Sequence, residues 1–273
     1  MATRTEWESG VGRNWAAESA RTDRSFAALT PTLLDRIGRE SGRSIVDIGC
    51  GAGEVALAVA AARPRARVLG IDISPDLVAA ASMRGGRVAN CSFALADATD
   101  WTPDRGAPDL YVSRHGVMFF DDPVAAFMHL RAVAASDARL VFSCFRSPGE
   151  NLWASEVARA VGAVPPAGAD PHAPGPFAFA DPDYVSRILA SAGWRAFHAE
   201  PVDFTYLAGE GDAPVGDALS YLTRIGPAAR ALRDFSKADR AAAKQRLAAL
   251  LAERCEGAAV AFPAAAWIVT ASA

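Results

Sequence analysis

A glycine-rich segment near the start of the chain constrains the fold more than any other feature. The segment VDIGCGAGE, residues 46–54, follows a short β-branched run and precedes a stretch with helical character. Glycines at a strand-to-helix turn allow the backbone to turn sharply and let a ligand approach without meeting a Cβ atom. The segment therefore predicts an α/β domain with a ligand at the end of its first strand.

Strand-like and helix-like segments alternate after this point. The expected strands are 44–48, 67–71, 91–95, 109–113 and 138–145, with helices at 55–63, 75–83 and 123–134. Two further strands are expected within 194–206 and 258–271. Strands joined by helical crossovers form right-handed βαβ units and a parallel sheet. The predicted fold class is therefore α/β, a doubly wound, mostly parallel Rossmann-like sheet with helical cap insertions.

The chain of 273 residues is longer than this sheet requires. We expect an N-terminal helical lid at 1–40, containing Trp7 and Trp15, and a sheet domain at 41–273. Insertions at about 151–180 and 207–257 would form a cap over the sheet. Closing a lid over a site excludes water, which is the function we expect of the N-terminal segment.

Charge and composition exclude several classes of partner. The net charge is −3 and the chain has no run of basic residues, so neither a nucleic acid nor an anionic membrane is an expected partner. No apolar stretch approaches the ~20 residues of a membrane span, and no apolar leader begins the chain. The four cysteines are widely spaced and form no CxxC pair, which favours a cytoplasmic protein. No feature predicts an oligomeric state.

Three aspartates follow strands of the expected sheet. Asp47 lies in the last part of the first strand, Asp72 ends the second and Asp97 follows the third. Because the carboxyl ends of parallel strands meet at one edge, these acids should converge on one crevice. Glu54 stands where the nicotinamide fingerprint G-x-G-x-x-G requires glycine, and no phosphate-binding P-loop is present. The acids and glycines suit a ligand that has a cationic amine, a ribose and an adenine but no phosphate.

These residues resemble the class I S-adenosylmethionine-dependent methyltransferases, in particular the bacterial small-molecule group that includes the ubiquinone/menaquinone-biosynthesis type. IVDIGCGAG (45–53) is similar to that family's first motif, GIDIS (70–74) to its ribose motif and ADA (96–98) to its adenine motif. SRHGVMFF (113–120) is similar to the segment after the fourth strand of many members. The resemblance covers roughly residues 40–145.

The resemblance implies S-adenosyl-L-methionine as cofactor. Asp72 would hold the ribose hydroxyls, Asp97 would accept from the adenine amine, and Asp47 would anchor the methionyl amine. The full implied set of cofactor-binding residues is Asp47, Gly49, Cys50, Gly51, Gly53, Asp72, Ile73, Asp97, Ala98, Ser113 and Arg114. No metal site is expected, because Asp122 before Pro123 is better explained as a helix cap than as a ligand.

Two side chains after the fourth strand are candidates for the chemistry. His115 lies where the methyl acceptor is expected, and its imidazole titrates near pH ~6.5, which suits a general base. The alternative is that His115 makes a local hydrogen bond or contacts the methionyl end of the cofactor. Arg114 is a candidate partner for the cofactor carboxylate or for an acidic acceptor.

The predicted function is methyl transfer to an oxygen, carbon or nitrogen of a small organic acceptor, with an aromatic or hydrophobic acceptor favoured. Candidate apolar walls are Phe119, Phe145, Trp153, Phe177, Phe179, Tyr206 and Tyr221. Two alternatives stay open. One is a non-catalytic cofactor-binding sensor or partner subunit. The other is a nicotinamide-dependent oxidoreductase, which Glu54 and the absence of a Tyr-x-x-x-Lys pair disfavour.

Overall fold

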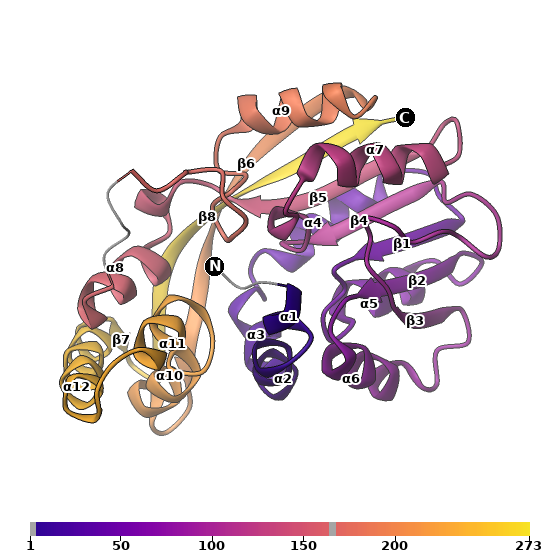
Figure 1. The fold of residues 1–273 in the computed structure, drawn as a ribbon. Coiled ribbons are helices and arrows are strands. Elements are labelled where there is room, and N and C mark those ends of the chain that lie inside the picture. Colours follow the sequence, from indigo (N-terminus) through magenta and orange to yellow (C-terminus); the bar gives the residue numbers. More distant parts are fainter. Residues whose placement is uncertain (1–3, 164–167) are drawn as a thin grey trace.

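A computed structural model describes residues 4–163 and 168–273, and its centre is one twisted sheet (Figure 1). The strand order is β3-β2-β1-β4-β5-β8-β6, and the short β7 pairs with β8. The strands are β1 (Ser44–Ile48), β2 (Arg67–Asp72), β3 (Cys91–Leu95), β4 (Leu110–Arg114), β5 (Arg139–Phe145), β6 (Arg195–Glu210), β7 (Cys255–Glu256) and β8 (Ala259–Ser272). Strands β1 to β5 pair in parallel, whereas β8 runs antiparallel between β5 and β6. The predicted mostly parallel sheet is confirmed.

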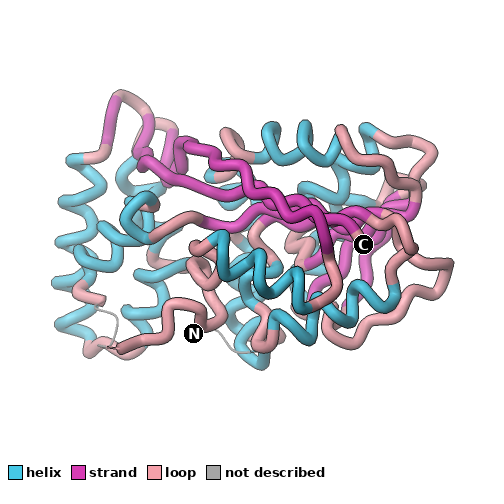
Figure 2. Tube along the Cα trace, turned by 90° about the horizontal axis from the view of Figure 1, so that it is seen from above, coloured by secondary structure: helices cyan, strands magenta, loops and turns pink. Residues whose placement is uncertain are grey.

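Helices cover both faces of the sheet, as Figure 2 shows from above. Successive side chains of a strand point to opposite faces, so Leu110 and Val112 of β4 enter one hydrophobic core while Tyr111 enters the other. The first core also contains α4 (Thr30–Gly38) and α5 (Glu54–Ala62), and the second contains α7 (Pro123–Val133) and α9 (Pro182–Ser191). Burial on both faces explains why these strands are continuously apolar in the sequence.

The crossover helices begin where the sequence predicts. Helix α6 (Pro75–Gly85) starts after Ser74, whose hydroxyl accepts the Leu77 N–H at 3.4 Å. Helix α7 starts after Asp122, whose carboxylate accepts the Ala125 N–H at 2.9 Å. A proline in the first turn of each helix lacks the N–H that would otherwise be unpaired there. Asp122 is thus a helix cap, as expected.

The remaining helices form an N-terminal group and a cap. The N-terminal group is α1 (Arg4–Trp7), α2 (Gly10–Ala17) and α3 (Ser19–Ser25), and the cap is α8 (Leu152–Val161), α10 (Pro214–Leu222), α11 (Gly226–Arg233) and α12 (Lys237–Glu253). Helix α2 packs against α6 and α3 against β6, so the N-terminal group lies between the sheet and the cap (Figure 1). No described helix is both long and apolar enough to cross a membrane.

The structure bears on the expected bounds of both insertions and of the N-terminal lid. Strand β6 continues four residues beyond Tyr206 to Glu210, so residues 207–210 of the expected second insertion are strand. The insertion itself stays a prediction. The first insertion, expected at about 151–180, contains α8, while its residues 164–167 lie outside the described residues. Residues 1–3 of the expected N-terminal lid lie outside them too.

Candidate functional site

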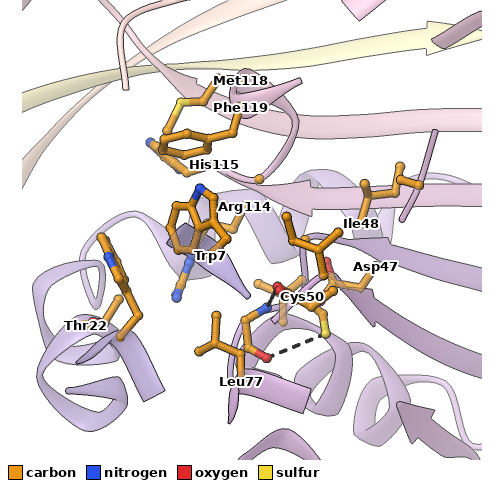
Figure 3. A pocket seen from close by; sticks show the side chains of 18 of the residues that line it. Trp7, Thr22, Asp47, Ile48, Cys50, Leu77, Arg114, His115, Met118 and Phe119 are labelled. Atoms are coloured by element: carbon orange, nitrogen blue, oxygen red, sulfur yellow. Dashed lines mark hydrogen bonds between the residues drawn. The ribbon is translucent and has the colours of Figure 1, made fainter. Parts of the chain in front are cut away.

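A cavity of about 500 Å³ opens at the carboxyl ends of β1, β2 and β4, in the size range of small-molecule sites. Its walls come from the glycine loop, the segments after β2, β3 and β4, the N-terminal helices and the cap. Figure 3 shows Asp47 and Cys50 on one side and Thr22 of α3 on the other, with Trp7 and Arg114 between them. Segments far apart in the sequence thus enclose one site, at the edge that the sequence predicts.

The glycine loop is held in an unusual backbone conformation. Gly49 and Gly51 have φ values of 62° and 53°, in the left-handed region that favours glycine. A Cβ on Gly49 would stand 3.0 Å from the Gly116 Cα, whereas one on Gly51 would meet nothing within 4 Å. Gly49 is therefore required by backbone packing, while Gly51 leaves open space beside the cavity that it lines.

Asp72 fixes this loop to β2. Its carboxylate accepts the backbone N–H groups of Gly51 and Ser74, each at 2.9 Å. Burial raises the pKa of Asp72, while hydrogen bonds from Ser74 and Gly51 oppose the rise. A carboxylate has about four acceptor positions, so two bonds leave Asp72 capacity for the hydroxyls of a ligand.

Asp47 lies beside the loop and is almost completely buried. Neither carboxylate oxygen has a hydrogen-bond partner among the described residues. Burial raises the pKa of Asp47 to about 7, and the attraction of Arg114 only partly offsets this effect. A buried carboxylate without a partner is costly, which indicates that a cationic group of a ligand belongs there.

The third aspartate also borders the cavity. Asp97 lines it together with Ile73 and Ala98. One carboxylate oxygen of Asp97 accepts both the N–H and the hydroxyl of Thr99, at 2.9 and 2.7 Å. The three aspartates predicted to converge therefore border a single cavity.

Arg114 is paired within the protein. Its guanidinium binds the carboxylate of Glu54, donates to the Thr30 hydroxyl at 2.8 Å and lies 3.5 Å from a carboxylate oxygen of Asp23. Asp23 also forms an ion pair with Arg84 at 2.8 Å. Burial raises the pKa of Glu54 to about 7, against the pull of Arg114. The sequence analysis missed Asp23 and the pairing of Glu54, because no motif links residues so far apart.

His115 has a strained backbone and an unpaired ring nitrogen. Its φ is 61°, uncommon for a residue other than glycine, and its N–H donates to the Ser143 carbonyl at 3.0 Å. Nδ1 is 2.8 Å from the Ser143 hydroxyl, while Nε2 is buried without a partner among the described residues. Burial, helped by Arg114, holds the pKa of His115 well below its usual value. The imidazole is therefore neutral at physiological pH.

Rings surround His115 and form what we call the aromatic end of the cavity: Phe26, His115, Phe145, Trp153 and Tyr206. The His115 ring is 5.0 Å from that of Phe26 and 4.1 Å from that of Phe145. Trp153 and Tyr206 stack at 4.8 Å with 14° between their planes. The sequence analysis missed Phe26, which lies in the N-terminal group and carries no motif.

Not every predicted site residue lines the cavity. Gly53 begins α5 and packs closely against Phe93, and the Ser113 hydroxyl donates to the Ile48 carbonyl at 2.7 Å. Both positions support the loop without bordering the cavity. The predicted walls Phe177, Phe179 and Tyr221 are also absent from the lining, whereas Phe119, Phe145, Trp153 and Tyr206 belong to it. No described group of three or more histidine, cysteine, aspartate or glutamate side chains is placed to hold a metal ion.

Comparison with protein families decides which kind of domain this is. A family model described as a methyltransferase domain matches residues 45–137, which include the glycine loop, Asp72, Asp97 and His115. This part of the chain is a class I S-adenosylmethionine-dependent methyltransferase domain. The predicted family is thereby confirmed, while the ubiquinone/menaquinone-biosynthesis subgroup stays a prediction.

Curated methyltransferases are similar to part of the chain. Trans-aconitate 2-methyltransferase of Methylobacterium radiotolerans is 42% identical over 90 residues, which are 33% of this chain and 33% of that protein. An Escherichia coli trans-aconitate 2-methyltransferase is 29% identical over 126 residues, or 46% of each chain. The matched part thus spans less than half the length of these relatives.

A solved methyltransferase structure confirms the fold of the whole chain. Phosphoethanolamine N-methyltransferase 2 of Haemonchus contortus, solved with phosphomonomethylethanolamine and S-adenosylhomocysteine, superposes with a TM-score of 0.56 at 15% identity. The superposition covers 99% of this chain and 57% of that one. The shared fold therefore extends over the strands and helices that lie beyond the family match.

Proposed function

We propose that the chain is an S-adenosylmethionine-dependent methyltransferase acting on a small organic acceptor. The observation that carries the proposal is one cavity with two buried, unpartnered groups. The Asp47 carboxylate lies beside the glycine loop, and the Nε2 of His115 lies at the aromatic end. The Asp47 carboxylate is suited to a cationic cofactor, and Nε2 of His115 is suited to a reacting acceptor.

The residues of the loop fit S-adenosylmethionine. Asp47 offers an unpaired carboxylate for the methionyl amine, and Asp72 has acceptor capacity left for ribose hydroxyls. Ile73 and Ala98 would pack on the adenine, and Asp97 would accept from its amine. Gly49, Cys50 and Gly51 border the same space without bulky side chains. When bound, this cofactor supplies a methyl group on a positively charged sulfur.

The other residues bind and prepare the acceptor. The aromatic end provides apolar surface that excludes water and restricts the orientation of the acceptor. His115 stays neutral, so Nε2 can accept a proton from an acceptor hydroxyl when Nδ1–H donates to Ser143. Arg114, held by Glu54 and Asp23, maintains the shape of the cavity between the two ends. His115 is thus the proposed catalytic base.

Binding and turnover together test this function. Calorimetry should show that S-adenosylmethionine and S-adenosylhomocysteine bind with one site per chain and that NADH does not. A radiolabelled methyl-release assay over a panel of acceptors should then show turnover. Binding of NADH without either adenosyl ligand would support the oxidoreductase instead. Adenosyl binding with no turnover on any acceptor would favour a sensor or partner subunit.

We further propose that residues 1–40 form a lid on the domain at 41–273. The ring centres of Trp7 and Phe119, both in the cavity wall, are 5.4 Å apart. Asp23 forms ion pairs with both Arg84 and Arg114, so the N-terminal group covers the site. Trypsin should cleave at the exposed Arg13 more slowly once S-adenosylhomocysteine is added. Cleavage at the exposed Arg240 in the cap is the internal control. Equal cleavage at Arg13 with and without the ligand would contradict a lid.

The acceptor is proposed to be a small molecule and not a nucleic acid, because the chain has a net charge of −3 and an enclosed, aromatic cavity. The trans-aconitate of the relatives is not carried over, since the matched region covers only 33% and 46% of them. A cytoplasmic location is proposed as well. The four cysteines are free, as expected in a reducing compartment.

A further inference from the structure

The aromatic end of the cavity indicates which class of acceptor fits the site, whereas the cofactor motifs do not. Five rings line it, and the four other than His115 are phenyl, phenol and indole surfaces that pack on one another in tilted, edge-to-face or stacked pairs. Such walls favour a flat aromatic molecule, whose faces and edges make complementary ring contacts. A compact acceptor is required, because about 500 Å³ must hold both acceptor and cofactor.

The polar groups at this end are nearly all paired. The Tyr206 hydroxyl lies 3.4 Å from that of Tyr221, which in turn lies 3.3 Å from the hydroxyls of Ser25 and Thr22. Nε2 of His115 is different, since the residue is only 8% exposed and this atom has no described partner. A single hydrogen-bond donor on the acceptor would satisfy it.

The charges around the cavity disfavour an anionic acceptor. Among the described residues that line it, Arg114 is the permanent cation, and its guanidinium is already bound by Glu54 and Asp23. All other charged lining residues are carboxylates: Asp23, Asp47, Glu54, Asp72, Asp97, Asp121 and Asp122. A carboxylate on the acceptor would be buried without a free cationic partner, at a high cost in free energy.

From these three observations we propose that the acceptor is an uncharged, planar aromatic molecule with one hydroxyl group, which donates to Nε2 of His115. This inference rests on the proposed methyltransferase function and names its substrate class. The proposed acceptor differs from trans-aconitate, the polycarboxylate for which the relatives are named. The aromatic walls hold the rings, His115 recognises the hydroxyl, and the paired Arg114 leaves no place for a carboxylate.

Equilibrium binding tests the proposal without relying on turnover. The probes are 2-naphthol, naphthalene, 2-decalol, 6-hydroxy-2-naphthoate and trans-aconitate, each titrated by calorimetry and saturation-transfer NMR into the full chain saturated with S-adenosylhomocysteine. We expect 2-naphthol to bind about 3- to 10-fold more tightly than naphthalene or 2-decalol. It should bind about 100-fold more tightly than 6-hydroxy-2-naphthoate, and trans-aconitate should not bind.

Two variants test whether His115 is the residue that causes the preference for a hydroxyl group. His115→Asn should bring 2-naphthol and naphthalene to equal affinity, because asparagine tolerates the left-handed backbone but does not present Nε2. Tyr221→Phe, which removes a hydroxyl outside the cavity lining, should keep the preference for 2-naphthol. Retention of the preference in His115→Asn would overturn the assignment of the hydroxyl to His115.

The outcomes separate this proposal from the proposed function. Failure of S-adenosylhomocysteine to bind would contradict the methyltransferase function itself. If it binds, absence of 2-naphthol binding would overturn the proposed substrate class and leave the cofactor assignment intact. Binding of 6-hydroxy-2-naphthoate or trans-aconitate as tight as that of 2-naphthol would overturn it as well.

Discussion

Replacing Asp47 with asparagine is expected to stabilise the ligand-free protein and, in the same variant, to weaken S-adenosylhomocysteine binding about 10- to 100-fold. The two effects have one cause. Above pH 7 the free protein buries a carboxylate without a hydrogen-bond partner, and asparagine removes that charge with little change in shape. The ligand loses the anion that would pair with its amine.

The pH dependence of this effect follows from the raised pKa. Burial raises the pKa of Asp47 from 3.8 to about 7, so between these values the folded state holds a proton that the unfolded state has lost. That proton stabilises the fold below about pH 4, and the stabilisation is lost as the pH rises through about 7. The variant should therefore lose less stability than the wild type between pH 5 and 8. The pKa of Glu54 is also raised to about 7, so the difference between the two proteins, and not either profile alone, reports on Asp47.

Ligand affinity should change with pH in the opposite direction. A cationic amine requires the ionised carboxylate, so wild-type affinity should fall by up to about tenfold for each pH unit below 7, and Asp47→Asn should flatten this dependence. Thermal unfolding and calorimetry between pH 5.5 and 8 measure both effects. A stabilisation of 1 kcal/mol corresponds to about 2–4 °C in a chain of this size.

A matched control is available on the opposite edge of the sheet. Asp109 accepts N–H groups of Arg43 and Ser44 at 2.9 Å, so its carboxylate is satisfied within the protein. Asp109→Asn should lower the unfolding temperature and leave ligand affinity unchanged. If Asp47→Asn instead lowers the unfolding temperature at pH 8 and binds the ligand normally, Asp47 is a structural residue.

Local chemistry explains why much of the fold could be predicted from the sequence. The central parallel strands β1, β4 and β5 are buried on both faces, so each is a short apolar run. The crossover helices begin at visible caps such as Ser74 and Asp122. The three aspartates could be placed together because parallel strands end at one edge. Their convergence on one cavity depends on topology alone and needs no side-chain detail.

The rest of the site depends on contacts that no local pattern encodes. Asp23 contacts Arg114, although the two residues are 91 positions apart in the sequence. Phe26 reaches the aromatic end of the cavity only because α3 packs against β6. Arg114 was therefore expected to be free for a ligand, while the structure shows it bound by Glu54 and Asp23. The extra length of β6 is not predicted either, because its last residues 207–210 do not alternate in burial and include alanine and glycine, which are depleted in strands.

Changing His115 to asparagine should lower the turnover number about 10²- to 10⁴-fold with a hydroxyl acceptor, the range for loss of a positioned general base. The dissociation constant of S-adenosylhomocysteine should change less than about threefold, since Asp47 and Asp72 are the residues proposed to hold that ligand. Folding should survive, because asparagine is among the residues that adopt a φ of 61° most readily. The pKa of His115 lies well below its usual value, so the imidazole of the wild type is neutral. We therefore expect the turnover number at saturating cofactor to be constant from pH 6.5 upward.

Ser143 provides the second half of this test. Its hydroxyl lies 2.8 Å from Nδ1 and fixes the orientation of the ring, so Ser143 is a positioning residue. Ser143→Ala should lower the turnover number by about tenfold, less than His115→Asn, and should leave the Michaelis constant for the acceptor nearly unchanged. In the double variant the losses should not add, because a misplaced base matters only while the base is present. Full additivity, or normal turnover in His115→Asn, would make His115 a wall of the cavity and leave the acceptor proton to solvent.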